Sequence, residues 1–216
     1  MDYDPRATQL LRSSLGALLA KSDLPLKDGR YSKAEYEWRL ALERGADPHI
    51  LITPEIPAVH LGADDHRLLA CLVEHGASLD DQIRSGGLRF TTYLLKRWRE
   101  RCLTNPDAKL QKLIDQNVVE VMKIVLTQPV ELERTHNGPL SFLHSLMWQA
   151  PTKDRAVELM EDLIHLGVPF CEDVVGDAPY RKDTHPKTDA MVQKYHLKNI
   201  LEETASQSRA AHTRKI

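Results

Sequence analysis

The chain has few aromatic residues, few cysteines and no excess of either charge. Aromatic residues make up 6% of its 216 positions, and this scarcity, together with abundant leucine, favours helices over a β-sandwich. The 29 basic and 31 acidic side chains give a formal net charge of −2, so no global field draws the protein to nucleic acid or an anionic membrane. Cys71, Cys102 and Cys171 are an odd number at wide spacing, which predicts buried thiols in a reducing compartment and no disulfide.

Sequence features that would indicate particular functions are also missing. No apolar run is long enough to cross a bilayer, and the polar start at residues 1–6 has no apolar signal core, so we expect a soluble, cytoplasmic protein. The sequence has no glycine-rich phosphate loop, no Cys-x-x-Cys pair and no nucleophile elbow. It therefore predicts a protein that is not an enzyme and that uses no metal or cofactor.

Four leucine-rich segments end with similar punctuation, at Gly45, Gly76, Pro129 and Gly167. A glycine directly after a helical pattern predicts a left-handed residue that ends the helix, a conformation that a Cβ atom resists. The recurrence of such ends, at uneven spacing, indicates a loose repeat array. An array of this kind displays a long side surface, which suits binding another macromolecule better than chemistry on a small one.

The apolar periodicity predicts which segments are helical. Single helices are expected over residues 8–20, 33–44, 89–102 and 188–203, and helix pairs over 53–76, 105–129 and 137–167. Several positions carry particular expectations: a capping box of Ser32 and Glu35, an N-cap at Asn105 followed by Pro106, a polar break at 115–117, and a core place for Trp148. Inward faces are expected at Leu10, Leu11, Leu15, Leu18 and Leu19 in the first helix and at Met191, Val192, Tyr195, Ile200 and Leu201 in the last. The sequence therefore predicts one domain over residues 1–204 and a polar tail over 205–216.

Several of these segments resemble units of the ankyrin-repeat family. Residues 74–77, 44–48 and 166–169 are similar to the ends of its units, Thr53-Pro54 and residues 141–144 stand where a first helix would start, and residues 117–126 look like a second helix. The resemblance covers residues 33–204, with the 89–102 helix as an insertion that lengthens the period. It implies an all-α, ankyrin-like helix-pair solenoid with an N-terminal capping helix.

The resemblance also implies a function. In this family the turn tips and adjacent inner helices hold a protein partner, and the polar positions that correspond to them are Asp47, His49, Asp80, Gln82, Glu133, Arg134, His136 and Asn137. We therefore expect a non-catalytic module that binds a protein. A small array of this kind would suit an immunity or inhibitor protein that neutralises a cognate toxin or effector.

The strongest basic patch contains Lys96, Arg97, Arg99 and Arg101 around Trp98. One interpretation is a solvated helix side with Trp98 folded inward beside Leu94 and Leu95. Another is a contact through Arg97, Trp98 and Arg101 with an acidic protein face, and a third is a nucleic-acid-binding helical array. We prefer the first interpretation because the whole chain is nearly neutral, and of the other two we favour the acidic protein face over nucleic acid.

The densest set of potential metal ligands is His60, Asp64, Asp65 and His66. It supports an alternative function, a metal-assisted hydrolase. The competing interpretation is a polar turn in which Asp64 or Asp65 caps the following helix, and we prefer it because no distant ligand with fixed spacing completes a metal site.

Overall fold

The computed structural model describes residues 3–19, 31–54, 56–79, 89–105, 107–130, 132 and 141–170, and ten further positions between 190 and 205. In this part the chain is mostly helical, as the sequence predicts. Its contacts divide it into two compact units, Met1–Glu131 and Leu132–Ile216. The sequence predicts one domain over residues 1–204 and gives no sign of this division.

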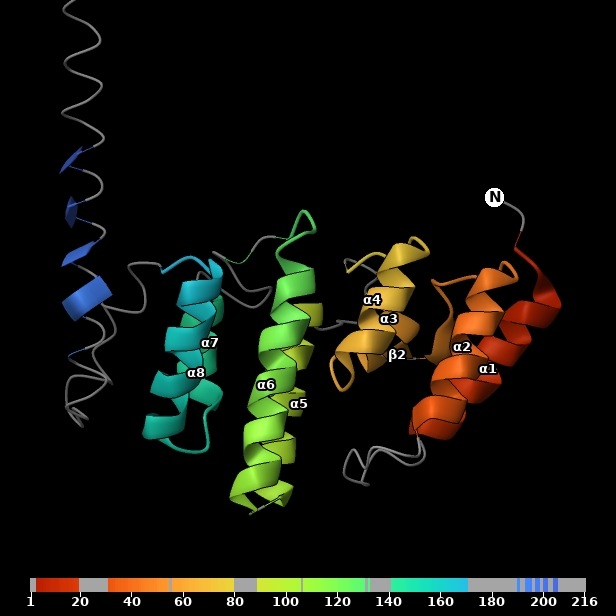
Figure 1. The fold of residues 1–216 in the computed structure, drawn as a ribbon, viewed down its shortest axis with the longest axis horizontal. Helices are drawn as coiled ribbons and strands as arrows, with labels where there is room; N and C mark the ends of the chain where they lie inside the picture. The colour runs from red at the N-terminus through yellow and green to blue at the C-terminus, as the bar shows by residue number, and fades with distance from the viewer. Residues whose placement is uncertain are drawn as a thin grey trace, which may run out of the picture. The chain divides into compact units, whose positions relative to one another are not determined.

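The first unit is built from three successive pairs of helices (Figure 1). Its elements are α1 (Pro5–Leu19), α2 (Tyr31–Glu43), β1 (Leu51–Thr53), β2 (Ile56–Pro57), α3 (Ala58–Leu61), α4 (His66–Glu74), α5 (Phe90–Thr104) and α6 (Ala108–Val125). Helix α1 packs on α2, α3 on α4 and α5 on α6. The pairs are joined through two rows of contacts, α2 to α4 to α6 and α1 to α3 to α5.

The core of this unit lies where the apolar stripes of these helices meet. Leu11 and Leu15 of α1 and Trp38 of α2 are completely buried. Leu10 is exposed, contrary to the prediction, because consecutive helical residues point about 100° apart and only one of Leu10 and Leu11 can face α2. The two cysteines that the structure describes are buried, as predicted, and burial raises the pKa of the Cys71 thiol.

A small antiparallel sheet joins α2 to α3. Strands β1 and β2 pair Leu51 with Pro57 and Thr53 with Ile56, with an irregular register between them. Thr53 and Pro54 therefore belong to a strand and its turn, and the prediction that they start a helix is wrong. Helix α3 begins instead at Ala58, and its third residue, His60, is buried.

Three helices end in the same way, as the sequence predicts. Gly45, Gly76 and Gly167 have φ values of +83°, +95° and +108°. Each donates its N–H to the carbonyl three residues back, and the next residue donates to the carbonyl five residues back, the pattern of a Schellman motif. The residues after these glycines, Ala46, Ala77 and Val168, are buried. The fourth predicted end differs. Helix α6 ends at Val125, and the chain then passes through a tight turn to Pro129 without a left-handed residue.

The structure corrects three predicted boundaries. Helix α6 runs without interruption through residues 115–117, because Asn117 turns inward and does not break the helix. Asp107, and not Asn105, caps its start, since the Asp107 carboxylate accepts a hydrogen bond from the N–H of Leu110 at 2.9 Å. Helix α2 begins at Tyr31, so Ser32 lies inside it and not directly before it. The supposed insertion over 89–102 is α5, which packs against α6 as the first helix of that pair.

The second unit contains one further pair, α7 (Phe142–Gln149) and α8 (Lys153–Leu166). Ser141 and Thr152 cap the two helices through side-chain oxygens that accept backbone N–H groups. Helical residues between 190 and 205 place Tyr195 in the core beside Phe170, but Ile200 and Leu201 are exposed, against the prediction. Met191 and Val192 lie outside the described residues, as do Cys171 and nearly all of the expected tail. None of the helices described combines the length and apolar character that crossing a membrane requires.

Candidate functional site

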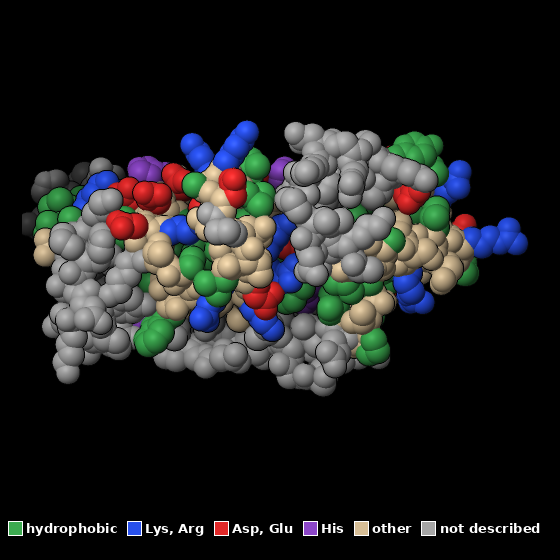
Figure 2. Space-filling view, turned by 90° about the horizontal axis from the view of Figure 1, so that it is seen from below, with side chains coloured by type: hydrophobic (Ala, Val, Ile, Leu, Met, Phe, Trp, Pro, Cys, Tyr) green, Lys and Arg blue, Asp and Glu red, His purple; other side chains and the backbone are tan. Residues whose placement is uncertain are grey.

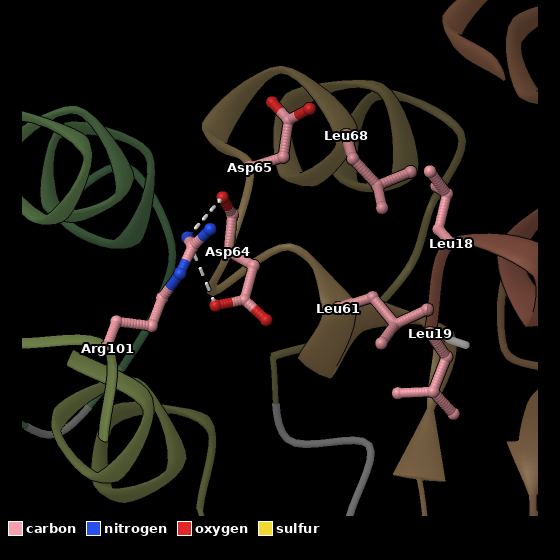
Figure 3. A pocket seen from close by; sticks show the side chains of 7 residues that line it. All are labelled: Leu18, Leu19, Leu61, Asp64, Asp65, Leu68 and Arg101. Atoms are coloured by element: carbon pink, nitrogen blue, oxygen red, sulfur yellow. Dashed lines mark hydrogen bonds and ion pairs between the residues drawn. The ribbon is translucent and has the colours of Figure 1, made fainter. Parts of the chain in front are cut away.

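The predicted ligand and basic clusters meet at the α3–α4 turn, residues 62–65 (Figure 3). Gly62 makes the turn possible, because a Cβ atom there would lie 2.8 Å from Cβ of Leu69 and 2.9 Å from the carbonyl oxygen of Val59. Asp65 caps α4 by accepting a hydrogen bond from the N–H of Arg67 at 3.0 Å. The interpretation of these residues as a helix-capping turn is confirmed.

Asp64 joins this turn to α5. Its Oδ2 accepts hydrogen bonds from Nε and Nη2 of Arg97 at 3.0 and 2.8 Å, and Nη1 of Arg101 lies 3.4 Å from Oδ1. The side chains of Arg97 and Arg101 are only 20% and 13% exposed. Burial opposes the charge on Arg97, but the Asp64 carboxylate, with smaller contributions from Tyr93 and Glu100, favours it, and the net effect raises the pKa of this guanidinium. Two cations that were expected to meet a partner are thus engaged within the protein.

Asn117 fixes the same turn from α6. Its Nδ2 donates to the carbonyl oxygen of Ala63 at 3.0 Å, and its Oδ1 accepts from the N–H of His66 at 3.1 Å and lies 3.0 Å from Nδ1 of that histidine. The turn is therefore held by both helices of the next pair. The prediction of a helix break at Asn117 is therefore wrong. A polar residue at an inward position of an otherwise apolar stripe was the signal that could have identified this role.

Trp98 is buried and does not form part of the surface. It is 1% exposed, like Leu94 and Leu95 beside it on α5, and its indole N–H donates to Oδ1 of Asp115 at 2.6 Å. The prediction that it folds inward is confirmed, and its place among the partner-binding residues is corrected. Lys96 and Arg99 are the exposed cations of this patch.

The four potential metal ligands near this turn do not converge. His60 is buried, with its ring 4.8 Å from that of Tyr93 and 6.0 Å from that of Phe90. Asp64 binds the arginines, Asp65 caps α4, and His66 bonds Asn117. Among the residues described, no group of three or more His, Cys, Asp or Glu side chains is placed to hold a metal ion.

The phenol of Tyr93, beside His60, is also affected by its surroundings. Burial raises the pKa of Tyr93, and Arg97 acts in the opposite direction.

A small pocket lies beside the turn. It is lined by Leu18, Leu19, Leu61, Asp64, Asp65, Leu68 and Arg101 (Figure 3). Its volume of about 30 Å³ has room for a water molecule or two. A substrate of metabolite size needs a pocket of several hundred Å³, so this space does not provide a substrate site.

The turn that follows α2 carries two predicted partner contacts. The Asp47 carboxylate accepts a hydrogen bond from the N–H of His49 at 2.9 Å, and the Asp47 N–H donates to Oγ1 of Thr8 at the same distance. Asp47 is half-buried by this role, whereas His49 is exposed. The turn is fixed locally and on α1, and His49 is the side chain that it presents.

Trp148 of α7 is 55% exposed, so the prediction that it belongs to the core is wrong. Its indole N–H donates to Nε2 of the buried His144 at 2.7 Å, and the two rings lie nearly parallel, with an interplanar angle of 14°. His144 stands three residues after the cap Ser141, where it bonds a side chain of its own helix. The sequence of this short helix does not show which of its aromatic side chains faces inward and which faces outward.

The remaining predicted contacts, Asp80, Gln82, Glu133, Arg134, His136 and Asn137, lie outside the described residues. Comparison of the chain with protein-family models, with characterised proteins and with solved structures finds no match.

Proposed function

We propose that this protein is an ankyrin-like helix-pair solenoid that binds another protein and performs no catalysis. The observation that carries this proposal is the pair of contact rows in the first unit, α2 to α4 to α6 and α1 to α3 to α5. Stacked pairs of this kind bury their apolar stripes against one another and leave the turns between them as a polar edge. The recurrent Schellman ends at Gly45, Gly76 and Gly167 support a shared unit.

The turns are held in place before a partner arrives. The α3–α4 turn is bound by Arg97, Arg101 and Asn117, and the turn after α2 by Thr8 and its own Asp47. A preformed edge loses little conformational entropy on association, so a few side chains can supply most of the affinity. The buried thiols Cys71 and Cys102 fit a reducing compartment, and we place the protein in the cytoplasm.

The experiment has two stages. Affinity capture on the full chain identifies a candidate partner, and calorimetry with the purified pair then compares His49→Ala with His165→Ala. Both histidines are exposed, but His49 lies on a turn and His165 on α8. We expect His49→Ala to weaken binding at least about fivefold and His165→Ala to leave it unchanged. Equal effects, or a failure of the purified proteins to bind each other, would reject the proposal.

An inhibitor is the specific form of this function that we propose, with a toxin or effector enzyme as its partner. Expression of the captured partner alone is then expected to arrest growth, and co-expression with this chain to restore it. A partner that is harmless when expressed alone would leave the binding function in place and exclude the inhibitor.

A further inference from the structure

Helices α5 and α6 extend past the neighbouring pair in the first unit (Figure 1). The α3–α4 turn meets them at Arg97 and Arg101 on α5 and at Asn117 on α6. Helix α6 begins at Ala108, and at a rise of about 1.5 Å per residue the helix between there and Asn117 is roughly 13 Å long. The start of α6 therefore projects beyond the turn, and α5 continues for three residues past Arg101, to Thr104.

The charges of these two helices are unbalanced. They carry seven basic and three acidic side chains, in a chain whose net charge is −2. The three carboxylates are all engaged: Glu100 pairs with Arg97 at 3.1 Å, Asp115 accepts from Trp98 at 2.6 Å, and Glu120 pairs with Lys123 at 2.7 Å. Arg97 and Arg101 bind Asp64.

Four cations remain, Lys96, Arg99, Lys109 and Lys112. All four are exposed, and in the part of the chain that the structure describes none of them makes an ion pair. Two large apolar side chains lie among them, Leu103 at 63% and Leu113 at 44% exposure. Spacings of three and four residues put Lys96, Arg99 and Leu103 on one face of α5, and Lys109, Lys112 and Leu113 on one face of α6. Figure 2 views the molecule from this end, where both basic and apolar side chains are exposed.

We propose that these six residues form a cationic surface that docks an acidic segment of the protein partner, one that carries apolar side chains between its carboxylates. Unpaired cations match carboxylates in charge, and the two leucines match aliphatic side chains. Nucleic acid fits less well, because Phe90 and Trp98 are buried and Tyr93 contacts His60, and leucine offers no ring on which a base could stack. This inference rests on the proposed protein-binding function and names the chemistry of the partner.

The test uses the full chain and defined probes. A fluorescent peptide of alternating glutamate and leucine pairs is titrated with the wild type, with a Lys109→Glu, Lys112→Glu double variant, and with an Arg6→Glu, Arg12→Glu double variant. The control arginines are exposed cations of α1, so both variants change the net charge equally. We expect binding that weakens with added salt, a loss of about tenfold or more in the first variant, and a change below about twofold in the control. Circular dichroism checks that both variants fold.

Four outcomes would overturn the proposal: no binding of the peptide, equal loss in both double variants, tighter binding of an oligonucleotide or of phosphatidylserine vesicles through the same lysines, or self-association through this surface that the first variant abolishes. A captured partner that binds the Lys109→Glu, Lys112→Glu variant as well as the wild type would also reject the cationic surface and leave the protein-binding function standing. If the peptide binds at this surface but the chain has no stable protein partner, the protein-binding function is rejected and the cationic surface is not.

Discussion

Trp98 and Trp148 have the same side chain but lie in opposite environments. Trp98 is buried with its N–H bound to Asp115, whereas Trp148 is more than half exposed. Replacing Trp98 by alanine is expected to lower the free energy of unfolding by about 3–5 kcal/mol, because it opens a large cavity. Trp148→Ala is expected to cost about 1 kcal/mol, chiefly the hydrogen bond to His144. Urea unfolding followed by circular dichroism gives both values, and equal losses would contradict the structure.

Asp64 is the residue through which the α3–α4 turn holds α5. In Asp64→Asn the carboxylate is replaced by an amide of similar size. Arg97 and Arg101, whose side chains are less than a quarter exposed, lose the Asp64 carboxylate, and Arg97 keeps its pair with Glu100. The expected loss in the free energy of unfolding is about 1–3 kcal/mol.

Glu120→Gln is the matched control for this change. Its partner Lys123 has a half-exposed side chain and lies three residues away on the same helix, so a loss within about 0.5 kcal/mol is expected. Urea titrations at low and high salt measure both variants. A loss no larger for Asp64→Asn than for Glu120→Gln would show that the ion-pair cluster does not stabilise this turn.

Residue roles were predictable where local chemistry determines them. Asp65 before an apolar run predicts a cap, and Trp98 between leucines predicts burial, and both are found. Roles that depend on a contact with a distant segment were not predictable. The partner of Asp64 is 33 residues away and that of Asn117 is 54 away, and no periodicity within either helix reports such a contact.

The helix ends provide a test at the scale of the element. Gly45, Gly76 and Gly167 adopt a left-handed conformation, which costs a residue with a Cβ atom about 1 kcal/mol or more. Each Gly→Ala variant is therefore expected to lose about that much free energy of unfolding. Gly16 lies inside α1 without positive φ and with open space where a Cβ would stand, so Gly16→Ala is expected to gain up to about 1 kcal/mol. Chemical denaturation of the four variants would contradict the assignment if all four changes had the same sign.

Whole elements were predicted well where the apolar period is long and less well where it is short. The α8 helix, with Gly167 after it, and the helical stretch that became α5 were both found. The β1–β2 hairpin was missed, because strands of three and two residues carry too few positions to show an alternating pattern. The prediction of two helices over residues 105–129 is wrong. Asn117 is buried against the α3–α4 turn, and a contact with another segment cannot be predicted from the pattern within residues 105–129.

At the scale of the whole molecule, the contacts that stabilise the first unit lie within Met1–Glu131. Every helix from α1 to α6 packs on at least two other elements of that unit. We therefore expect a fragment of residues 1–131 to unfold cooperatively in urea, with the fluorescence of its buried Trp38 and Trp98 and the helical signal changing together.

A fragment that ends at residue 104 is the informative comparison. It lacks α6, whose Val118, Val121 and Met122 are buried and which contacts both α4 and α5, and it leaves the Trp98 N–H without Asp115. Loss of that apolar surface removes several kcal/mol from a domain whose total stability is typically about 5–15 kcal/mol. The shorter fragment should therefore lose its sharp transition while the longer one keeps it. Should residues 1–131 unfold gradually, or both fragments unfold alike, the first unit would depend on the rest of the chain and the contact rows would not by themselves account for its stability.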